Sequence, residues 1–156
     1  MWKTEFFFSK NIKLKDLIYL HFKSEEIEFE SKCEKCKKKT VHTKEMFFSH
    51  PPEILILSLQ RINNRTKKKN EIPIQFNEVL NLNQFIDEDC NENKGASYVL
   101  YGIANHIGNI EVGHYFSYIK IGANWFEFND SIVKQIGKIE VISSNVYVLF
   151  YRRNDV

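Results

Sequence analysis

The stretch GHYFSYIKIGANWFEFND, residues 113–130, contains two alternating runs separated by Gly122-Ala123-Asn124. Alternation with a period of two is typical of β-strands, and a short Gly/Asn segment between two such runs predicts a β-hairpin. In such a hairpin, His114 and Asn129 lie toward the same open end, within a few residues of register. Residues two apart share a face of a strand, so the two predicted faces are His114, Phe116 and Tyr118 on one strand and Trp125, Glu127 and Asn129 on the other.

The pair of His114 and Asn129 has the composition of a catalytic base and the residue that orients it. An amide oxygen accepts a hydrogen bond from an imidazole N–H and thereby fixes the tautomer. We expect Asn129 to accept from Nδ1–H of His114, which leaves Nε2 free to take a proton. A neutral orienting group suits a thiol nucleophile, because cysteine is already acidic and its base needs less help. Taken alone, the pair also fits an ordinary hydrogen-bonded histidine.

The length and composition of the chain bound its class. It has 156 residues, 43% of them hydrophobic, with 13 Phe, 7 Tyr and 2 Trp. This size suits a single domain, 1–156, or a piece of a larger one, and the aromatic content excludes a disordered chain. The 22 basic and 20 acidic residues nearly cancel, so neither nucleic acid nor a membrane is expected as a partner. Three cysteines, two of them in a Cys-x-x-Cys, do not indicate a secreted disulfide framework, and we expect an intracellular protein, cytoplasmic or nuclear.

Outward from the hairpin, the sequence predicts an α+β fold that is mainly antiparallel β with a short N-terminal helix. The apolar run ILILSLQRI, residues 54–62, suggests a strand buried on both faces. The run Lys67–Lys69 is expected to be a solvated loop tip. The predicted elements are a helix over 14–22, strands over 41–48, 54–62, 97–106, 113–121, 125–129 and 145–153, an irregular strand-like stretch over 71–86, and loops over 63–70 and 87–97.

Six segments follow one another in an order that resembles the C-terminal half of the catalytic domain of ubiquitin-specific proteases (USPs), a family of cysteine deubiquitinases. The resemblance runs from Leu14 to Arg153 and rests on CEKC, PPEILILSLQRI, YVLYGIANHIG, GHYFSYIK, WFEFND and VYVLFYRR. Gly-His-Tyr, Trp-x-x-Phe-Asn-Asp and the closing Tyr-Val-Leu-Phe-Tyr are specific in combination. The resemblance implies a papain-like cysteine protease fold, of which this chain holds the palm and part of the fingers.

The resemblance also implies roles for single residues. His114 is similar to the catalytic general base, Asn129 to the residue that orients it, and Asp130 to the polar residue that shares this duty in some members. Tyr115, His106 and Gly113 resemble positions of the channel for the ubiquitin tail, with core packing as the alternative for Tyr115. The segments 105–113 and 87–97 resemble two loops that flank this channel.

The nucleophile of the family is not found in this chain. Its cysteine lies in a box with Asn, Gly and an aromatic residue, and no such box occurs here. Cys33 and Cys36 stand in a Lys-rich turn and Cys90 in an acidic loop, so none of the three resembles the nucleophile. We therefore expect no cleavage by this chain alone, either because it is part of a longer enzyme or because it is an inactive relative.

Cys33 and Cys36 have the spacing of zinc ligands, but a structural zinc site needs four ligands. The resembled family has a second Cys-x-x-Cys upstream, which this chain lacks, and His42 is the one nearby candidate for a third ligand. Three interpretations stay open: half of a zinc site, a vestigial turn and a redox pair. No cofactor is expected for catalysis, and a structural zinc is expected only with ligands from outside this chain.

Three functions remain at this point. The first is part of a deubiquitinase that hydrolyses the isopeptide bond at the ubiquitin C-terminus. The second is an inactive ubiquitin-binding or scaffold module with a decayed USP fold. The third is a basic zinc-knuckle domain that binds RNA, against which the net charge of +2 counts. Ubiquitin or its conjugates are the partners expected from the first two.

Overall fold

The computed structural model describes residues 12–63, 65–87, 89, 95–137 and 145–154, with no statement on the side chains of 28–31 and 40. The fold is a mostly antiparallel sheet with one α-helix in the described ranges, which confirms the predicted α+β class. The helix α1 (Leu14–Phe22) begins and ends where the sequence predicts it. No helix of these ranges is long and apolar enough to cross a membrane.

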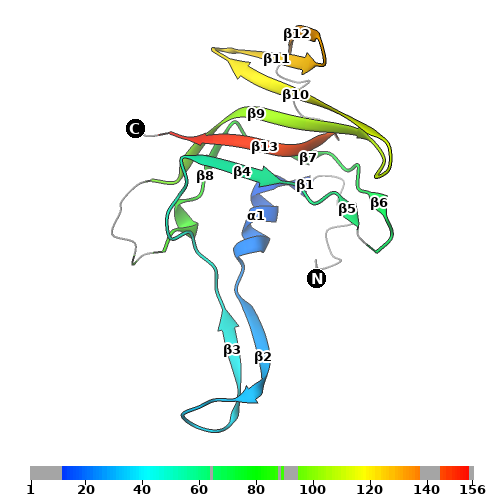
Figure 1. Cartoon of the computed structure of the whole chain (residues 1–156). Helices are drawn as coiled ribbons and strands as arrows, with labels where there is room; N and C mark the ends of the chain where they lie inside the picture. The colour runs from blue at the N-terminus through cyan, green and yellow to red at the C-terminus, as the bar shows by residue number, and fades with distance from the viewer. Residues whose placement is uncertain (1–11, 64, 88, 90–94, 138–144, 155–156) are drawn as a thin grey trace.

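The large sheet has the strand order β12-β11-β10-β9-β13-β4, and β8 pairs with the remaining part of β9. All of these pairings are antiparallel. β9 is long enough to pair with three neighbours, which makes it the central element of the sheet (Figure 1). The strands are β4 (Ile54–Ser58), β8 (Val79–Asn81), β9 (Ser97–Gly108), β10 (Gly113–Ile121), β11 (Asn124–Asn129), β12 (Ile132–Ile136) and β13 (Val146–Arg153).

One hydrophobic core joins α1 to the sheet. Leu14 and Ile18, four residues apart on α1, are buried on the same face of the helix. β9 and β13 supply side chains with no more than 1% exposure, including Leu100, Leu149 and Tyr151. The Tyr151 hydroxyl donates to the carbonyl of Asn77 at 2.9 Å, and burial raises the pKa of this phenol well above its usual value. The core therefore anchors β9, which pairs directly with β10, and β13 on the other side of β9.

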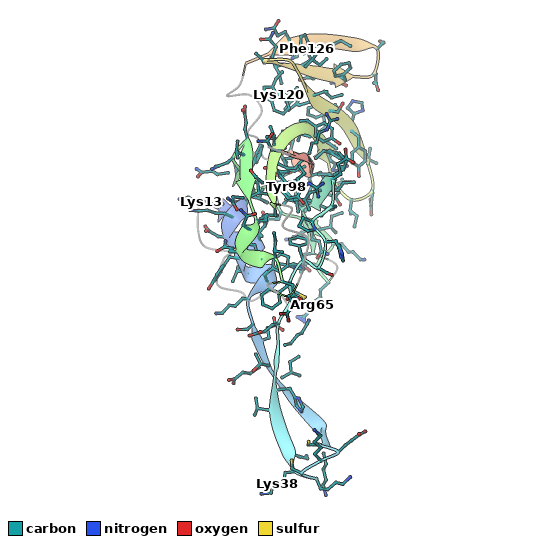
Figure 2. The ribbon with its side chains drawn as sticks, turned by 90° about the vertical axis from the view of Figure 1, so that its left-hand side faces the viewer. Lys13, Lys38, Arg65, Tyr98, Lys120 and Phe126 are labelled. Carbon is teal, nitrogen blue, oxygen red and sulfur yellow. The ribbon has the colours of Figure 1, made fainter. Side chains whose placement is uncertain are left out.

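A separate hairpin projects from the body of the molecule. It consists of β2 (Glu25–Lys32) and β3 (Lys39–Lys44), and its tip carries Cys33 and Cys36. Figure 2 shows Lys38 at the far end of this hairpin, well separated from Tyr98 in the core. The sequence analysis did not predict β2, although Ile27 and Phe29 alternate with glutamates along it, because two apolar positions are a short signal for a strand.

Several short elements lie outside the large sheet and the projecting hairpin. β1 (Ile12–Lys13) pairs in parallel with β7 (Ile74–Gln75), and β5 (Ile62–Asn63) pairs with β6 (Lys68–Lys69). The 3₁₀ turn η2 (Asn83–Phe85) and an isolated bridge between Phe48 and Ile86 complete this set.

Several predicted boundaries are wrong. The strand over 54–62 is shorter and lies at the sheet edge, so Ile56 is 58% exposed and only one face is buried. The strand over 41–48 ends at Lys44, and the loop over 63–70 contains half of a small hairpin. β12 follows β11 in a stretch that was not predicted as a strand. The loop expected over 105–113 shrinks to 109–112, because β9 continues to Gly108. Most of the loop expected over 87–97, with Cys90, lies outside the described residues.

Replacing Leu149 by alanine should lower the free energy of unfolding by about 2–5 kcal/mol, because its side chain is fully buried between β9 and β4 and leaves a cavity. Ile132→Thr is the control, since Ile132 is 63% exposed on β12 and surface changes usually stay within about 0.5 kcal/mol. Urea unfolding followed by circular dichroism measures both. Similar losses for the two variants would contradict this placement of the core.

Candidate active site

Two hairpins that share β11 bring His114 and Asn129 together. His114 lies near the start of β10, and Asn129 is the last residue of β11. A two-residue turn follows at once, since Asn129 pairs with Ile132. Asp130 opens this turn with a φ of +52°, a conformation that tight hairpin turns require and that aspartate tolerates. The turn therefore fixes where β11 ends and so where the Asn129 side chain lies.

The predicted pair forms in the structure. Nε2 of His114 lies 2.7 Å from Oδ1 of Asn129. An amide oxygen only accepts, so the proton of this hydrogen bond sits on Nε2. The prediction that Nδ1 would donate to Asn129 is wrong: the ring presents Nε2 to the asparagine and leaves Nδ1 as the nitrogen that is free to accept a proton.

The His114 ring is held on one side and open on another. It stacks on Phe116, two residues along the same face of β10, with ring centroids 6.5 Å apart and an angle of 16°. Its side chain keeps 40% exposure. A reacting group can therefore reach the imidazole, while the stacking and the bond to Asn129 restrict how the ring turns.

Asp130 stands near the same nitrogen but does not bond to it. Its Oδ2 lies 4.0 Å from Nε2 of His114, beyond hydrogen-bond range, and its side chain is 81% exposed. The carboxylate is thus an exposed neighbour of the His114 ring and not its hydrogen-bond partner in this arrangement.

The turn before His114 is built from backbone that excludes side chains. Gly108 has a φ of +99°, and a Cβ there would stand 2.4 Å from the carbonyl oxygen of Val112. The Asn109 side chain accepts from the backbone N–H groups of Glu111 and Val112, both at 2.8 Å. A Cβ on Gly113 would meet Nε2 of His106 at 2.1 Å. This four-residue loop, 109–112, is therefore tightly specified.

His106 and Tyr115 lie directly opposite each other on β9 and β10. Their rings are 4.6 Å apart, and Tyr147 of β13 completes the cluster at 5.7 Å from His106 and 6.2 Å from Tyr115. His106 is buried, and burial followed by the charge of Lys69 holds the pKa of this imidazole below its usual value. Tyr115 is 60% exposed, so full core packing is excluded for it.

Two residues of this region escaped the sequence analysis. Tyr147 belongs to the aromatic cluster, and its alternation with buried positions of β13 was the one available signal. Lys69 donates to backbone carbonyls of β9, a contact with no sequence signature, because backbone groups look alike at every position.

Cys33 and Cys36, the two cysteines that the structure describes, lie far from His114. Cys33 and Cys36 are free thiols at the tip of the β2–β3 hairpin, at the opposite end of the molecule from β10 and β11 (Figure 1). Hydrogen bonds from the backbone of Cys36 and Lys35, and from the Cys36 side chain, lower the pKa of the Cys33 thiol. Among the described residues no three His, Cys, Asp or Glu side chains gather as metal ligands, so His42 does not complete a site there.

Comparison with known proteins gives a consistent answer. The family described as "Ubiquitin carboxyl-terminal hydrolase" matches residues 9–151. "Ubiquitin carboxyl-terminal hydrolase 21" of Mus musculus is 33% identical over 146 residues, which cover 90% of this chain and 25% of the relative. "Ubiquitin carboxyl-terminal hydrolase 8" of Saccharomyces cerevisiae is 31% identical over 159 residues, covering 92% of this chain and 34% of the relative.

Solved structures agree with the sequence relatives. The "SAGA Ubp8/Sgf11/Sus1/Sgf73 DUB module bound to ubiquitin aldehyde" matches with a TM-score of 0.75 and 28% identity, over 93% of this chain and 34% of that one. Another solved SAGA DUB module with Ubp8 gives a TM-score of 0.78 and 30% identity. The chain therefore spans about a third or less of the length of these relatives and matches solved protease modules along almost its whole length.

The purified chain should hold no zinc tightly, because two thiolates alone bind this metal orders of magnitude more weakly than four ligands do. Metal analysis after dialysis measures the zinc content per chain. One tightly held zinc per chain, lost in Cys36→Ser, would contradict the expectation and point to ligands outside the described residues. Half a zinc per chain would indicate a site shared by two copies.

Proposed function

The chain belongs to the ubiquitin carboxyl-terminal hydrolase family, and from that premise we propose that it is the base-bearing part of a cysteine-type deubiquitinase. The single observation that carries this is the 2.7 Å hydrogen bond between Nε2 of His114 and Oδ1 of Asn129. It leaves Nδ1 of a partly exposed imidazole free to accept a proton. The family and the relatives support the reaction class, and the geometry supports the assignment of the residues.

The nucleophile would come from protein outside this chain. A thiol there gives its proton to Nδ1 of His114, and the resulting thiolate attacks the carbonyl carbon of the isopeptide bond after the C-terminal glycine of ubiquitin. The imidazolium then protonates the leaving amine, and the acyl group stays on sulfur as a thioester. Water attacks the thioester with its proton taken by the same nitrogen, which returns the thiol and frees the ubiquitin carboxylate.

Asn129 and Asp130 take different parts in this scheme. Asn129 holds the ring through Nε2, so that Nδ1 faces away from it. Asp130 is exposed and 4.0 Å away, which places it to accept from Nε2–H if Asn129 is removed. Tyr115, His106 and Gly113 form the wall beside the base where the C-terminal tail of ubiquitin would pass.

A second candidate is an inactive module that binds ubiquitin without cleaving it. The observation that favours it is the location of the described thiols, since Cys33 and Cys36 stand at the hairpin tip and not beside His114. In this case the same wall would hold ubiquitin and no proton transfer would follow.

The 156-residue chain alone should not cleave a fluorogenic ubiquitin amide, because it brings a base and an orienting residue but no described thiol beside them. Release of the fluorophore by the purified chain is the measurement. Turnover that disappears in Cys33→Ser or Cys90→Ser would show that the nucleophile lies within this chain.

In a protein that joins this chain to a nucleophile-bearing half, His114→Ala should lower kcat by about 10²–10⁴-fold, because it removes the general acid and base. Asn129→Ala should cost less, since only ring orientation is lost and Asp130 stands next in line. The double variant Asn129→Ala with Asp130→Ala should approach the activity of His114→Ala.

The ubiquitin Kd is the control, and it should change little in each of these variants because none of the three replaced side chains offers much contact area. Equal kcat for the unchanged protein and His114→Ala would remove the catalytic assignment and leave the binding module in its place.

A further inference from the structure

One lysine of the run Lys67–Lys69 behaves unlike its neighbours. The Lys69 ammonium donates to the carbonyl oxygen of His106 at 2.6 Å and to that of Gly108 at 3.2 Å. Lys67 and Lys68 are exposed, as a solvated loop tip would have them, whereas Lys69 is half-buried. The expectation of a solvated tip is therefore wrong for Lys69.

The two carbonyls lie at the end of β9 that pairs with the start of β10. His106 and Gly108 lie at the end of β9, just before the loop 109–112, and β10 begins directly after this loop. Gly108 pairs with Gly113, and Ile107 pairs with His114. An ammonium that binds both carbonyls thus holds the end of β9, and the backbone of His114 pairs with this end of the strand.

The position of Lys69 is itself secured from the core side. The Arg61 guanidinium is 3% exposed and donates to the carbonyls of Asn70 and Ile72 at 3.0 and 2.9 Å. The backbone of Asn70 also donates to the carbonyl of Arg61 at 2.7 Å. The residue after Lys69 is therefore held by a buried cation, and β6 lies beside the end of the β9–β10 hairpin (Figure 1).

We propose that Lys69 is a positioning residue for His114, which acts by clamping the end of β9 through the carbonyls of His106 and Gly108. This inference rests on the proposed function only in naming His114 as the base. The clamp itself stands on the two hydrogen bonds and on the register of β9 with β10.

A charged donor suits this task better than a neutral one. Hydrogen bonds from an ammonium are shorter and stronger than neutral ones, and the three donors of lysine allow two carbonyls to be bound at once. Burial lowers the pKa of Lys69, while the nearby Glu71 acts in the opposite direction. Lys69 also lies close enough to His106 to disfavour a second positive charge there.

The effect of Lys69 on the pKa of His106 provides a measurement of the clamp that does not depend on activity. The groups that surround the His106 ring are Tyr115 from β10, Tyr147 from β13 and the Lys69 ammonium from β6. Burial and Lys69 both lower the pKa of His106, whose ring packs against Gly113. Removing the ammonium takes away one of the two causes, and the pKa of His106 must then rise toward its ordinary value.

The first experiment uses the 156-residue chain and needs no activity. In Lys69→Met, amide hydrogen exchange over residues 109–114 should become about tenfold faster or more, because both charge-assisted hydrogen bonds are lost and even one of them corresponds to that factor. The imidazole titration of His106, followed by NMR, should move to higher pH. Lys69→Arg should restore both, and the exposed neighbour Lys68→Met should change neither.

The second experiment uses the protein that carries the nucleophile. Lys69→Met should lower kcat by about 10- to 100-fold through misplacement of His114, with KM little changed and with recovery in Lys69→Arg. Unchanged exchange and an unchanged His106 titration in Lys69→Met would overturn the clamp. A normal kcat for Lys69→Met beside a strongly reduced His114→Ala would also overturn it, while a normal kcat for His114→Ala would overturn the proposed function instead.

Discussion

The antiparallel register of β10 on β11 is the constraint on which the rest of the structure depends. Side chains of a strand alternate between faces, so a slip of one residue would send His114 and Asn129 to opposite sides of the sheet. This register pairs Tyr118 with Glu127 and is closed by the two-residue turn between Ile121 and Asn124. Because β9 pairs with β10 on one side and with β13 on the other, the buried core carries this register through to the candidate base.

How far the sequence predicts the molecule depends on whether a feature is local. The hairpin over 113–130 and the helix over 14–22 were predicted, because each has a clear period within one stretch of chain. The run 54–62 was misjudged, since no local pattern tells a central strand from an edge strand whose outer isoleucines face solvent. Most of the small elements between β3 and β8 fall in the same class, as they are two or three residues long.

In the candidate site too, the local features were predictable from the sequence and the non-local ones were not. The meeting of His114 with Asn129 follows from strand alternation, whereas the ring nitrogen that faces the asparagine depends on the side-chain torsions and on the stacking with Phe116. Lys69 is invisible in the sequence because it bonds to backbone oxygens 37 and 39 residues away. Polar side chains that serve the backbone leave no pairing signal, and only the folded chain reveals them.

The loop 109–112 and the two glycines beside it contain positions that cannot change and positions whose side chains can vary. Gly108 and Gly113 admit no side chain, and the Asn109 side chain accepts hydrogen bonds from the loop backbone, so these three positions determine the conformation of the loop. Ile110, Glu111 and Val112 are exposed, and Glu111 and Val112 take part in these bonds through their backbone. An engineer who wished to vary the surface beside the imidazole has, in these three side chains, a small library site whose scaffold would stay in place.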